Sequence, residues 1–318
     1  MQKKLMTCLL TIILFVLILS FNYSKKKINF ANKNQSKKDI EKEERFDLDK
    51  YYEKENKILN ENLEKIIDEE TQKLGGDYQI AIDTVKGKSN IHIGKKSNPQ
   101  NKIQPSASTI KIFIALDVYK KIEDDELNEE DIKDDVYIML KDSNNEATNR
   151  LIDKLGGFDS VDETIKNISG RNLTDLNRKM LYEGVENMAN ASDLNKALKA
   201  ISRAEYLNRE NSDKILKAMS DNTSTSKTKL LANVNKDFKM CNKSGELANI
   251  GVQNDIALIN TGESEYAISV LSHIPNHSSK TLNFQFEVLR NLGKRTSEEF
   301  SNFDKKINSY KHVEKTTL

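Results

Sequence analysis

The sequence predicts an α+β fold in which a five-stranded antiparallel sheet carries N- and C-terminal helices and an inserted all-helical subdomain. Strand-like alternation occurs twice before residue 117 and three times after residue 235. The stretch between them, about 117–235, shows repeated charged amphipathic segments and is predicted to be entirely helical. Two strands before an insertion and three strands after it can together form one antiparallel sheet.

The composition excludes several classes of function. The chain has 318 residues, with 50 basic and 49 acidic side chains, and no basic stripe interleaved with aromatics, so we expect no nucleic-acid partner. Two cysteines, Cys8 and Cys241, do not make a disulfide framework, and Cys241 is predicted to be a small packed side chain. There is no glycine-rich phosphate loop, and we expect no cofactor and no metal.

The N-terminal region predicts a membrane attachment. An uncharged run from Leu5 to Phe21 has a length between that of a signal-peptide core and a spanning helix, and no small-residue cleavage site follows it. We therefore expect residues 1–23 to be an uncleaved signal anchor, with a cleaved signal peptide as the alternative. Residues 24–52 are rich in Lys, Asn, Glu and Asp and are predicted to be a charged tether. The remainder, 53–318, is predicted to form one folded domain.

The elements of this domain follow in order. Ile58, Leu59, Leu63, Ile66 and Ile67 recur at helical spacing, and Gly75-Gly76 ends that helix. The predicted strands are Tyr78–Val85 and Asn90–Ile93 before the insertion, and Phe238–Asn242, Asp255–Asn260 and Tyr266–Leu271 after it. An amphipathic helix at Thr281–Leu292 is predicted to close the chain.

Ser108 and Lys111 lie at the start of a predicted apolar helix that precedes the insertion. They lie three residues apart, which places both side chains on one helical face, and the following residues are apolar on almost every side. Burial lowers the pKa of a lysine, so that the neutral amine can take the proton of a serine nucleophile. Ser-x-x-Lys also occurs three times in polar stretches of this chain, so the pair alone is weak evidence.

Two further motifs downstream make the Ser108–Lys111 pair a more specific signal. Ser143-Asn144-Asn145 lies within MLKDSNNEATNRLI, and Lys243-Ser244-Gly245 lies within KMCNKSGE. With Ser-x-x-Lys, this order matches the Ser-Asp-Asn and Lys-Thr-Gly signature of penicillin-recognising serine enzymes, with mild departures at Asn144 and Ser244. From about Glu53 to its end, the chain resembles the class A β-lactamase-like serine hydrolases, and NNEATNRLIDKLGG and KSGELANIGVQNDIALI resemble the family's flanking segments.

The resemblance implies a role for each motif residue. Ser108 would attack an amide, Lys111 would take its proton, and Ser143 would relay a proton to the leaving nitrogen. The substrate-binding residues would be Asn145, Lys243, Ser244 and Gly245, with the backbone N–H groups of Ser108 and Glu246 as the oxyanion hole. Taken singly, Asn145 can be an ordinary amide, Ser143 a cap of the helix beginning at Asn145, and Lys243 a strand-edge lysine.

One family residue is missing. Class A β-lactamases carry a glutamate two residues after a loop arginine, where it activates the water that releases the acyl group. Here Arg178 is followed by Met180 at that spacing, and a thioether cannot activate water. Glu183 and Glu186 lie nearby, and each is predicted to be an exposed loop glutamate, with a displaced base at one of them as the alternative.

The sequence therefore favours a serine hydrolase that opens β-lactam amides through an acyl-enzyme on Ser108, with release of the acyl group in doubt. The alternatives are a cell-wall D-Ala-D-Ala peptidase like the penicillin-binding proteins, and a membrane-tethered β-lactam or peptidoglycan-binding protein that is not an enzyme. The expected partners are a small β-lactam or a cell-wall peptide and, through the N-terminal segment, a membrane. We expect a monomer located outside the cytoplasm.

Overall fold

The computed structural model describes residues 48–72, 74–171, 173–222 and 228–317, together with Lys25 and Lys27. The chain divides into two compact units, Met1–Lys54 and Glu55–Leu318, and the fold described below belongs to the second. The predicted anchor at 1–23 and most of the predicted tether at 24–52 lie outside the described residues. Within the described part, no helix combines the length and the apolar character that crossing a bilayer requires.

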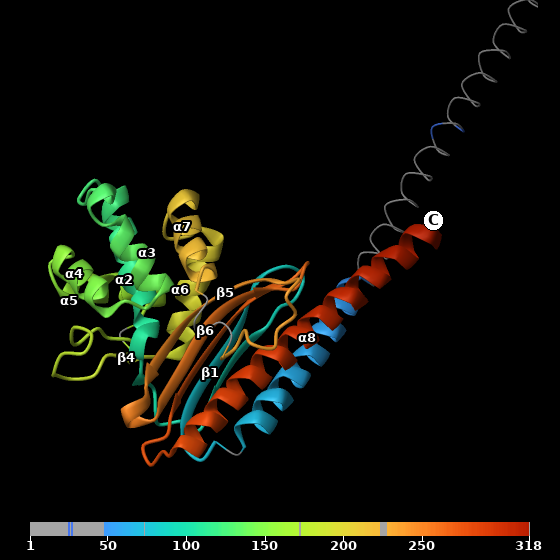
Figure 1. Ribbon diagram of the computed structural model, residues 1–318. Helices are drawn as coiled ribbons and strands as arrows, with labels where there is room; N and C mark the ends of the chain where they lie inside the picture. Colours follow the sequence, from blue (N-terminus) through green and yellow to red (C-terminus); the bar gives the residue numbers. More distant parts are fainter. Residues whose placement is uncertain are drawn as a thin grey trace, which may run out of the picture. The chain divides into compact units, whose positions relative to one another are not determined.

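Five strands of the described chain form one antiparallel sheet, which confirms the predicted fold class (Figure 1). They are β1 (Asp77–Lys86), β2 (His92–Lys96), β5 (Lys239–Leu247), β6 (Val252–Asn260) and β7 (Glu265–His273). Their order is β2-β1-β7-β6-β5, so the first strand of the chain pairs with the last and β5 lies at an edge. All five strands overlap their predicted positions, and those after the insertion are longer because cross-strand pairing extends beyond the apolar runs.

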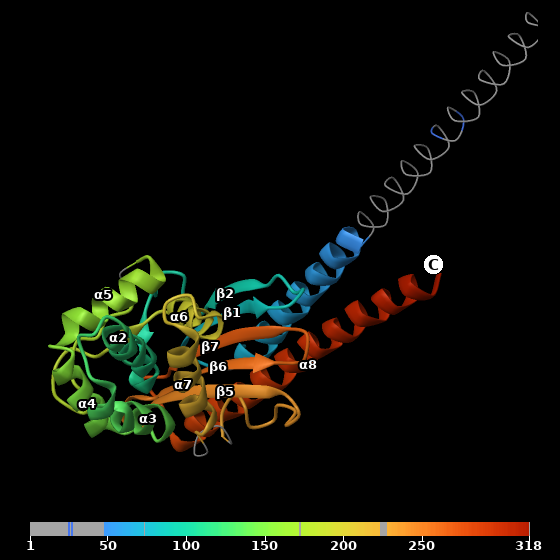
Figure 2. The ribbon, with the colours of Figure 1, turned by 90° about the horizontal axis from the view of Figure 1, so that it is seen from above.

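Helices cover both faces of the sheet. On one face lie the helix at residues 55–71 and α8 (Ser279–Thr317), where Phe300 stacks on Tyr266 of β7. On the other face, α6 (Ala191–Arg203) packs on β1 and β7, and α7 (Arg209–Ser220) packs on β5. Figure 2 shows α6 and α7 over the sheet, with the remaining helices of the insertion grouped beyond its end.

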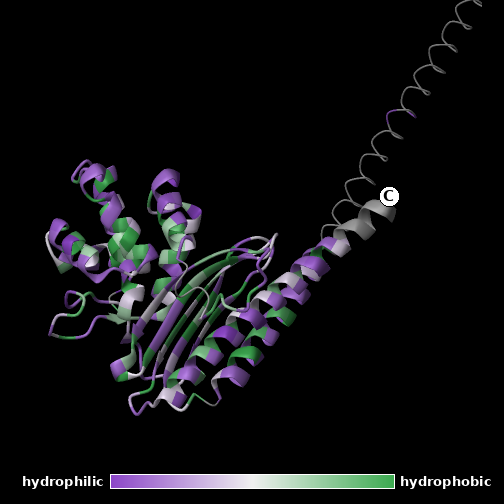
Figure 3. Ribbon diagram, in the orientation of Figure 1, coloured by the Kyte–Doolittle hydropathy of each residue, from purple (hydrophilic) through white to green (hydrophobic). Residues whose placement is uncertain are grey.

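The inserted subdomain is built around α2 (Lys111–Glu123), whose residues from 111 to 119 are all buried. Figure 3 shows this helix as largely hydrophobic, unlike the mixed surfaces of its neighbours. The other described elements of the insertion are η2 (Glu129–Asp131), α3 (Lys133–Lys141), α4 (Asn145–Lys154) and α5 (Phe158–Ser169). A short helix, η1 (Ala107–Ile110), precedes α2, and η3 (Ala248–Ile250) joins β5 to β6.

The prediction that residues 117–235 are entirely helical is wrong in two regions. Residues 228–234 form turns and bends. Between α5 and residue 190 the described residues form no helix, and β4 (Met188–Ala189) pairs there with β3 (Gln104–Pro105). Hydrogen bonds from side chains outweigh local helix propensity here: Asn187 accepts from the N–H groups of Asn177 and Arg178.

The C-terminal helix is also longer than predicted. It begins at Ser279 and ends at Thr317, whereas the sequence predicts a helix from Thr281 to Leu292. Phe300, Phe303 and Ile307 are buried and continue its apolar face.

Candidate active site

Ser108 and Lys111 lie at the junction of two helices. Ser108 belongs to the 3-10 helix η1, and Lys111 is the first residue of α2. Side chains three residues apart eclipse one another in 3-10 geometry, so both project on one side. Ser108 is half-buried, and Lys111 is fully buried. Among the described residues, the Ser108 hydroxyl has no hydrogen-bond partner and is left available for a ligand.

The Lys111 amine is held by the segment that precedes α4. Its Nζ donates to the Ser143 carbonyl at 2.7 Å and to Asn145 Oδ1 at 2.7 Å, and it lies 3.3 Å from Ser143 Oγ. The alternative prediction that Ser143 caps the helix beginning at Asn145 is wrong. Asn144 is the cap, since its side chain accepts from the Ala147 N–H. Ser143 is therefore left facing the two lysines of the site.

Lys243 reaches the same hydroxyl from the sheet. Its Nζ donates to Ser143 Oγ at 2.8 Å and to the Ser244 carbonyl at 3.0 Å. The Ser143 hydroxyl thus lies between the amines of Lys111 and Lys243, although Lys243 is 100 residues away in the sequence. Ser244 joins this network through its backbone carbonyl, and its hydroxyl has no hydrogen bond to another described residue of the site.

Gly245 places the edge strand against the candidate nucleophile. A Cβ at this residue would lie 2.9 Å from the Ser108 backbone N, from Ala107 Cβ and from the Ser106 carbonyl oxygen. No side chain fits in that space, so the contact between β5 and η1 requires glycine. The next residue, Glu246, belongs to the same edge strand and lines one pocket with Ser108.

The electrostatics of the site favour a neutral base. Burial, with the nearby charge of Lys243, lowers the pKa of Lys111 to about 6. Burial also lowers the pKa of Lys243 to about 7, while Asp255 opposes the change and Lys229 adds to it. At neutral pH, Lys111 is therefore mainly an uncharged amine, which is the form that can accept a proton.

The backbone is strained at three points of the site. Ala107, Ser143 and Leu181 have φ of 47°, 57° and 66°, in the left-handed region that side chains other than glycine rarely adopt. They make up three of the five such residues in the described chain, and such strain concentrates at functional sites.

A loop from 176 to 190 closes the remaining wall of the site. Arg178 pairs with Glu186 at 2.5 Å and donates to the Tyr182 carbonyl. The Asn187 carbonyl accepts from both the N–H and the hydroxyl of Ser106, two residues before the candidate nucleophile. The loop is thus fixed at its base to η1.

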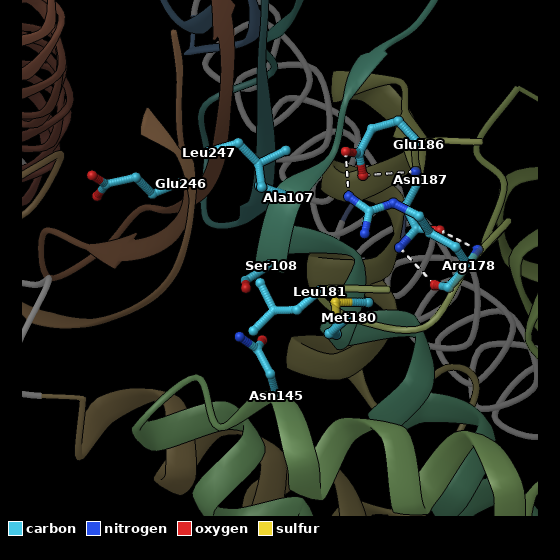
Figure 4. Close-up of a pocket in the computed structure, with 10 residues that line it drawn as sticks. All are labelled: Ala107, Ser108, Asn145, Arg178, Met180, Leu181, Glu186, Asn187, Glu246 and Leu247. Carbon is cyan, nitrogen blue, oxygen red and sulfur yellow. Dashed lines mark hydrogen bonds and ion pairs between the residues drawn. The ribbon is translucent and has the colours of Figure 1, made fainter. Parts of the chain in front are cut away.

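The pocket at Ser108 combines the motifs with this loop (Figure 4). Its lining residues are Ala107, Ser108, Asn145, Arg178, Met180, Leu181, Glu186, Asn187, Glu246 and Leu247. In Figure 4 the side chains of Leu181 and Asn145 lie beside Ser108, whereas the Glu246 side chain points away from it. Glu183 is exposed, as expected, but the expectation of exposure is wrong for Glu186, which is half-buried in its ion pair and lines the pocket.

Three residues of the site were not found from the sequence. Asn254 of β6 donates to the carbonyls of Pro105 and Ser106 and so holds the strand that leads into η1. Asn187 holds the loop, and Lys229 is buried behind β5. Each acts on backbone atoms far away in the sequence, and no local pattern marks it.

The family follows from the sequence comparison. A sequence model described as the beta-lactamase enzyme family matches residues 129–296, more than half of the chain. The chain belongs to this family. The match contains the Ser143 and Lys243 motifs and begins after Ser108, so the contacts described above are what connect the first motif to this β-lactamase family member. No significant sequence match was found among curated proteins.

Solved structures share the fold of this β-lactamase family member. The TLA-1 extended-spectrum β-lactamase has a TM-score of 0.66 and 16% identity over 76% of this chain and 99% of its own. A β-lactamase from Xanthomonas campestris has a TM-score of 0.65 and 16% identity, over 76% and 98%. A mutant of PBP-A, solved as its acyl-enzyme complex with penicillin G, has a TM-score of 0.62 and 18% identity, over 73% and 95%.

Proposed function

We propose that this protein is a serine acyl-transfer hydrolase that opens β-lactam amides through an acyl-enzyme on Ser108 and releases the acyl group slowly. The observation that carries the proposal is the state of Lys111. Its amine is fully buried, its pKa is about 6, and it is bonded to the segment that holds Ser143 and Asn145. A neutral amine one helical turn from a serine with an unpartnered hydroxyl is a nucleophile with its base.

In the acylation step, the Ser108 Oγ–H proton passes to the neutral Lys111 Nζ as Oγ bonds to the amide carbonyl carbon. The C–N bond breaks when Ser143 gives its hydroxyl proton to the leaving nitrogen. Ser143 regains a proton from Lys111 or Lys243, whose amines lie 3.3 Å and 2.8 Å from its oxygen. The products are a Ser108 ester and an amine, which in a β-lactam stays on the same molecule.

Binding uses the remaining motif residues. Asn145 directs its Oδ1 to Lys111, so its amide nitrogen is available for a substrate carbonyl. Charged Lys243, with the hydroxyls of Ser143 and Ser244, would bind the carboxylate that β-lactams carry. The N–H groups of Ser108 and Glu246 would bind the developing oxyanion, and losing one such donor costs about 3 kcal/mol of transition-state stabilisation.

Slow release follows from the loop. Met180 is buried, lines the pocket and has no group that can take a proton from water. The acidic residues that line the pocket are Glu186 and Glu246. Both Glu186 oxygens are already engaged, Oε2 by Arg178 and Oε1 by the Asn187 N–H, and the Glu246 side chain points away from Ser108. Neither carboxylate is placed to activate water for an acyl group on Ser108.

A second candidate function is a cell-wall D-Ala-D-Ala peptidase, which β-lactams would trap. Met180 favours it, because a long-lived acyl-enzyme is what a trapped peptidase forms, and the PBP-A neighbour was solved in such a complex with penicillin G. Both functions place the substrate outside the cytoplasm, in keeping with the predicted anchor at 1–23. A tethered protein that binds without turnover is the third possibility.

One experiment separates the three functions. The protein is mixed with a chromogenic β-lactam, and product release and intact mass are followed together. We expect one adduct per chain on Ser108, formed quickly and lost slowly. Cleavage of a D-Ala-D-Ala peptide would favour the peptidase, and an unmodified Ser108 with no product would refute acyl transfer.

A further inference from the structure

Lys229 is a fully buried lysine that the proposed mechanism does not use. Its Nζ donates to the carbonyl oxygen of Gly245 at 3.0 Å and to that of Asn254 at 3.1 Å. Gly245 and Asn254 are directly opposed in the β5–β6 register. The ammonium therefore lies over the junction of these two strands, immediately behind the residue that contacts η1.

Neighbouring residues hold Lys229 and the residue that follows it in place. The N–H of the next residue, Leu230, donates to Asp255, and α8 approaches Leu230 so closely that a Cβ on Gly293 would lie 1.7 Å from its carbonyl oxygen. Burial lowers the pKa of Lys229, but the carboxylates of Asp255 and Glu246 favour its charged form. The Glu246 carboxylate lies 3.9 Å from the amine.

The peptide that Lys229 contacts is the one that matters for acyl transfer. The Gly245 carbonyl and the Glu246 N–H belong to a single trans peptide unit, so they point in opposite directions. With the carbonyl held by Lys229, the Glu246 N–H points away from that amine. A cation at an amide oxygen also polarises the whole peptide and makes its N–H a stronger donor.

We propose that Lys229 is a positioning residue for the oxyanion hole, which fixes the direction of the Glu246 N–H and strengthens it as a donor. The proposal rests on the proposed function, because that N–H has a catalytic role only if Ser108 forms an acyl-enzyme. It assigns to Lys229 an action through the backbone, with no contact between its side chain and the substrate.

The test compares four forms of the full-length protein: wild type, Lys229→Arg, Lys229→Gln and Lys229→Met. Arginine keeps the charge and the donors, glutamine keeps a donor without charge, and methionine keeps only the length. We expect acylation to slow about tenfold in Lys229→Gln and more in Lys229→Met, with partial recovery in Lys229→Arg. Lys239→Met, at the exposed far end of β5, is the matched control and should acylate like wild type.

A second readout separates positioning from folding. The infrared band of the Ser108 ester carbonyl reports the strength of its hydrogen bonds in the oxyanion hole. We expect this band at higher frequency in Lys229→Gln and Lys229→Met than in wild type and Lys229→Arg. Thermal unfolding of each variant shows whether it is folded, and Lys229→Gln supplies the comparison if Lys229→Met does not fold.

The outcomes decide the proposal. A wild-type band position in folded Lys229→Gln would overturn it, whether acylation slows or not, because Lys229 would then act only on stability or elsewhere in the site. A shifted band with slower acylation would support it. Absence of any adduct in the wild type would instead refute the proposed function.

Discussion

The motif cluster and the loop at 176–190 both border Ser108, yet they are built in opposite ways. In the cluster, two buried lysines share the Ser143 hydroxyl, and their pKa values are lowered to about 6 and 7. The loop offers Met180 and Leu181 to the same pocket, and its glutamate there is already paired with Arg178. The cluster holds proton-transfer groups, whereas the glutamate that the loop contributes to the pocket lining has both carboxylate oxygens engaged.

The two regions also differ in their outer surfaces. The cluster is enclosed, but the loop exposes Leu181, Tyr182 and Val185, which are 77%, 62% and 72% accessible. Exposed apolar side chains bury little surface, so these three contribute little to folding stability. Under the proposed function, forming and releasing the acyl group are therefore separable properties: we expect the cluster to support formation and the loop to slow release.

The largest expected effect is in the cluster. Lys111→Met removes the base and should slow acylation of Ser108 by about 10³-fold, within the usual range for general-base loss. The rate is measured by intact mass after mixing with a β-lactam. Lys120→Met changes a half-buried lysine of the same helix, which pairs with Asp124, and is the control. Equal rates in both variants would remove Lys111 from the mechanism.

The second effect is in the loop. Met180→Glu places a carboxylate in the pocket and should speed loss of the acyl group by about 100-fold, because a general base then activates water. Acylation should change little. The half-life of the Ser108 adduct is the measurement, and Met180→Gln controls for polarity without a base. If both variants release at the wild-type rate, the missing carboxylate does not limit release.

Gly245→Ala tests the contact between the cluster and β5. The added methyl would lie 2.9 Å from the Ser108 N, so we expect acylation to fall more than tenfold and stability to fall by about 1–3 kcal/mol. In Gly94→Ala, the added Cβ would lie 3.8 Å from Ser192 Oγ and meet no other heavy atom within 4 Å, so we expect neither the acylation rate nor the stability to fall. Thermal unfolding and adduct formation are measured on both variants, and similar behaviour would show that the edge strand can move.

The pH dependence should follow the two lysines. Acylation requires neutral Lys111, so its rate should rise through pH 6, with a loss of about tenfold per unit below that value. Binding of a carboxylate requires charged Lys243, so KM should rise above about pH 7. Because the two amines interact, the measured values belong to the pair. A flat profile between pH 5 and 8 would contradict the lowered pKa values.

The smallest effect concerns the Arg178–Glu186 pair. This pair is mostly buried, and Arg178→Met should lower stability by about 1 kcal/mol while acylation stays within a few-fold of wild type. Lys57→Met breaks a fully exposed pair and should leave the melting temperature unchanged. A large fall in acylation for Arg178→Met would show that the loop also takes part in forming the acyl-enzyme.

Local patterns predicted much of this molecule. Two local patterns were sufficient to predict a strand and a buried helix: Ile80 and Ile82 alternate with polar neighbours in the residues that form β1, and the residues that form α2 are apolar on almost every side. The burial of β1 and β7 does not follow an alternation, because most of their residues are buried whichever face they are on. The loop at 176–190 was mistaken for helix because its conformation depends on hydrogen bonds across the chain: the Asn187 side chain bonds backbone atoms of residues 177 and 178, and its backbone carbonyl accepts from Ser106, 81 residues away.

By itself, the sequence determined the order of the three motifs, the fold class and the absence of the loop glutamate, since each is carried by short runs of adjacent residues. Only the tertiary structure decided that the amines of Lys111 and Lys243 meet at one hydroxyl, that both have lowered pKa values, and that Lys229 lies behind the Gly245–Glu246 peptide. These properties arise from burial and from contacts across the sheet, which no local period encodes.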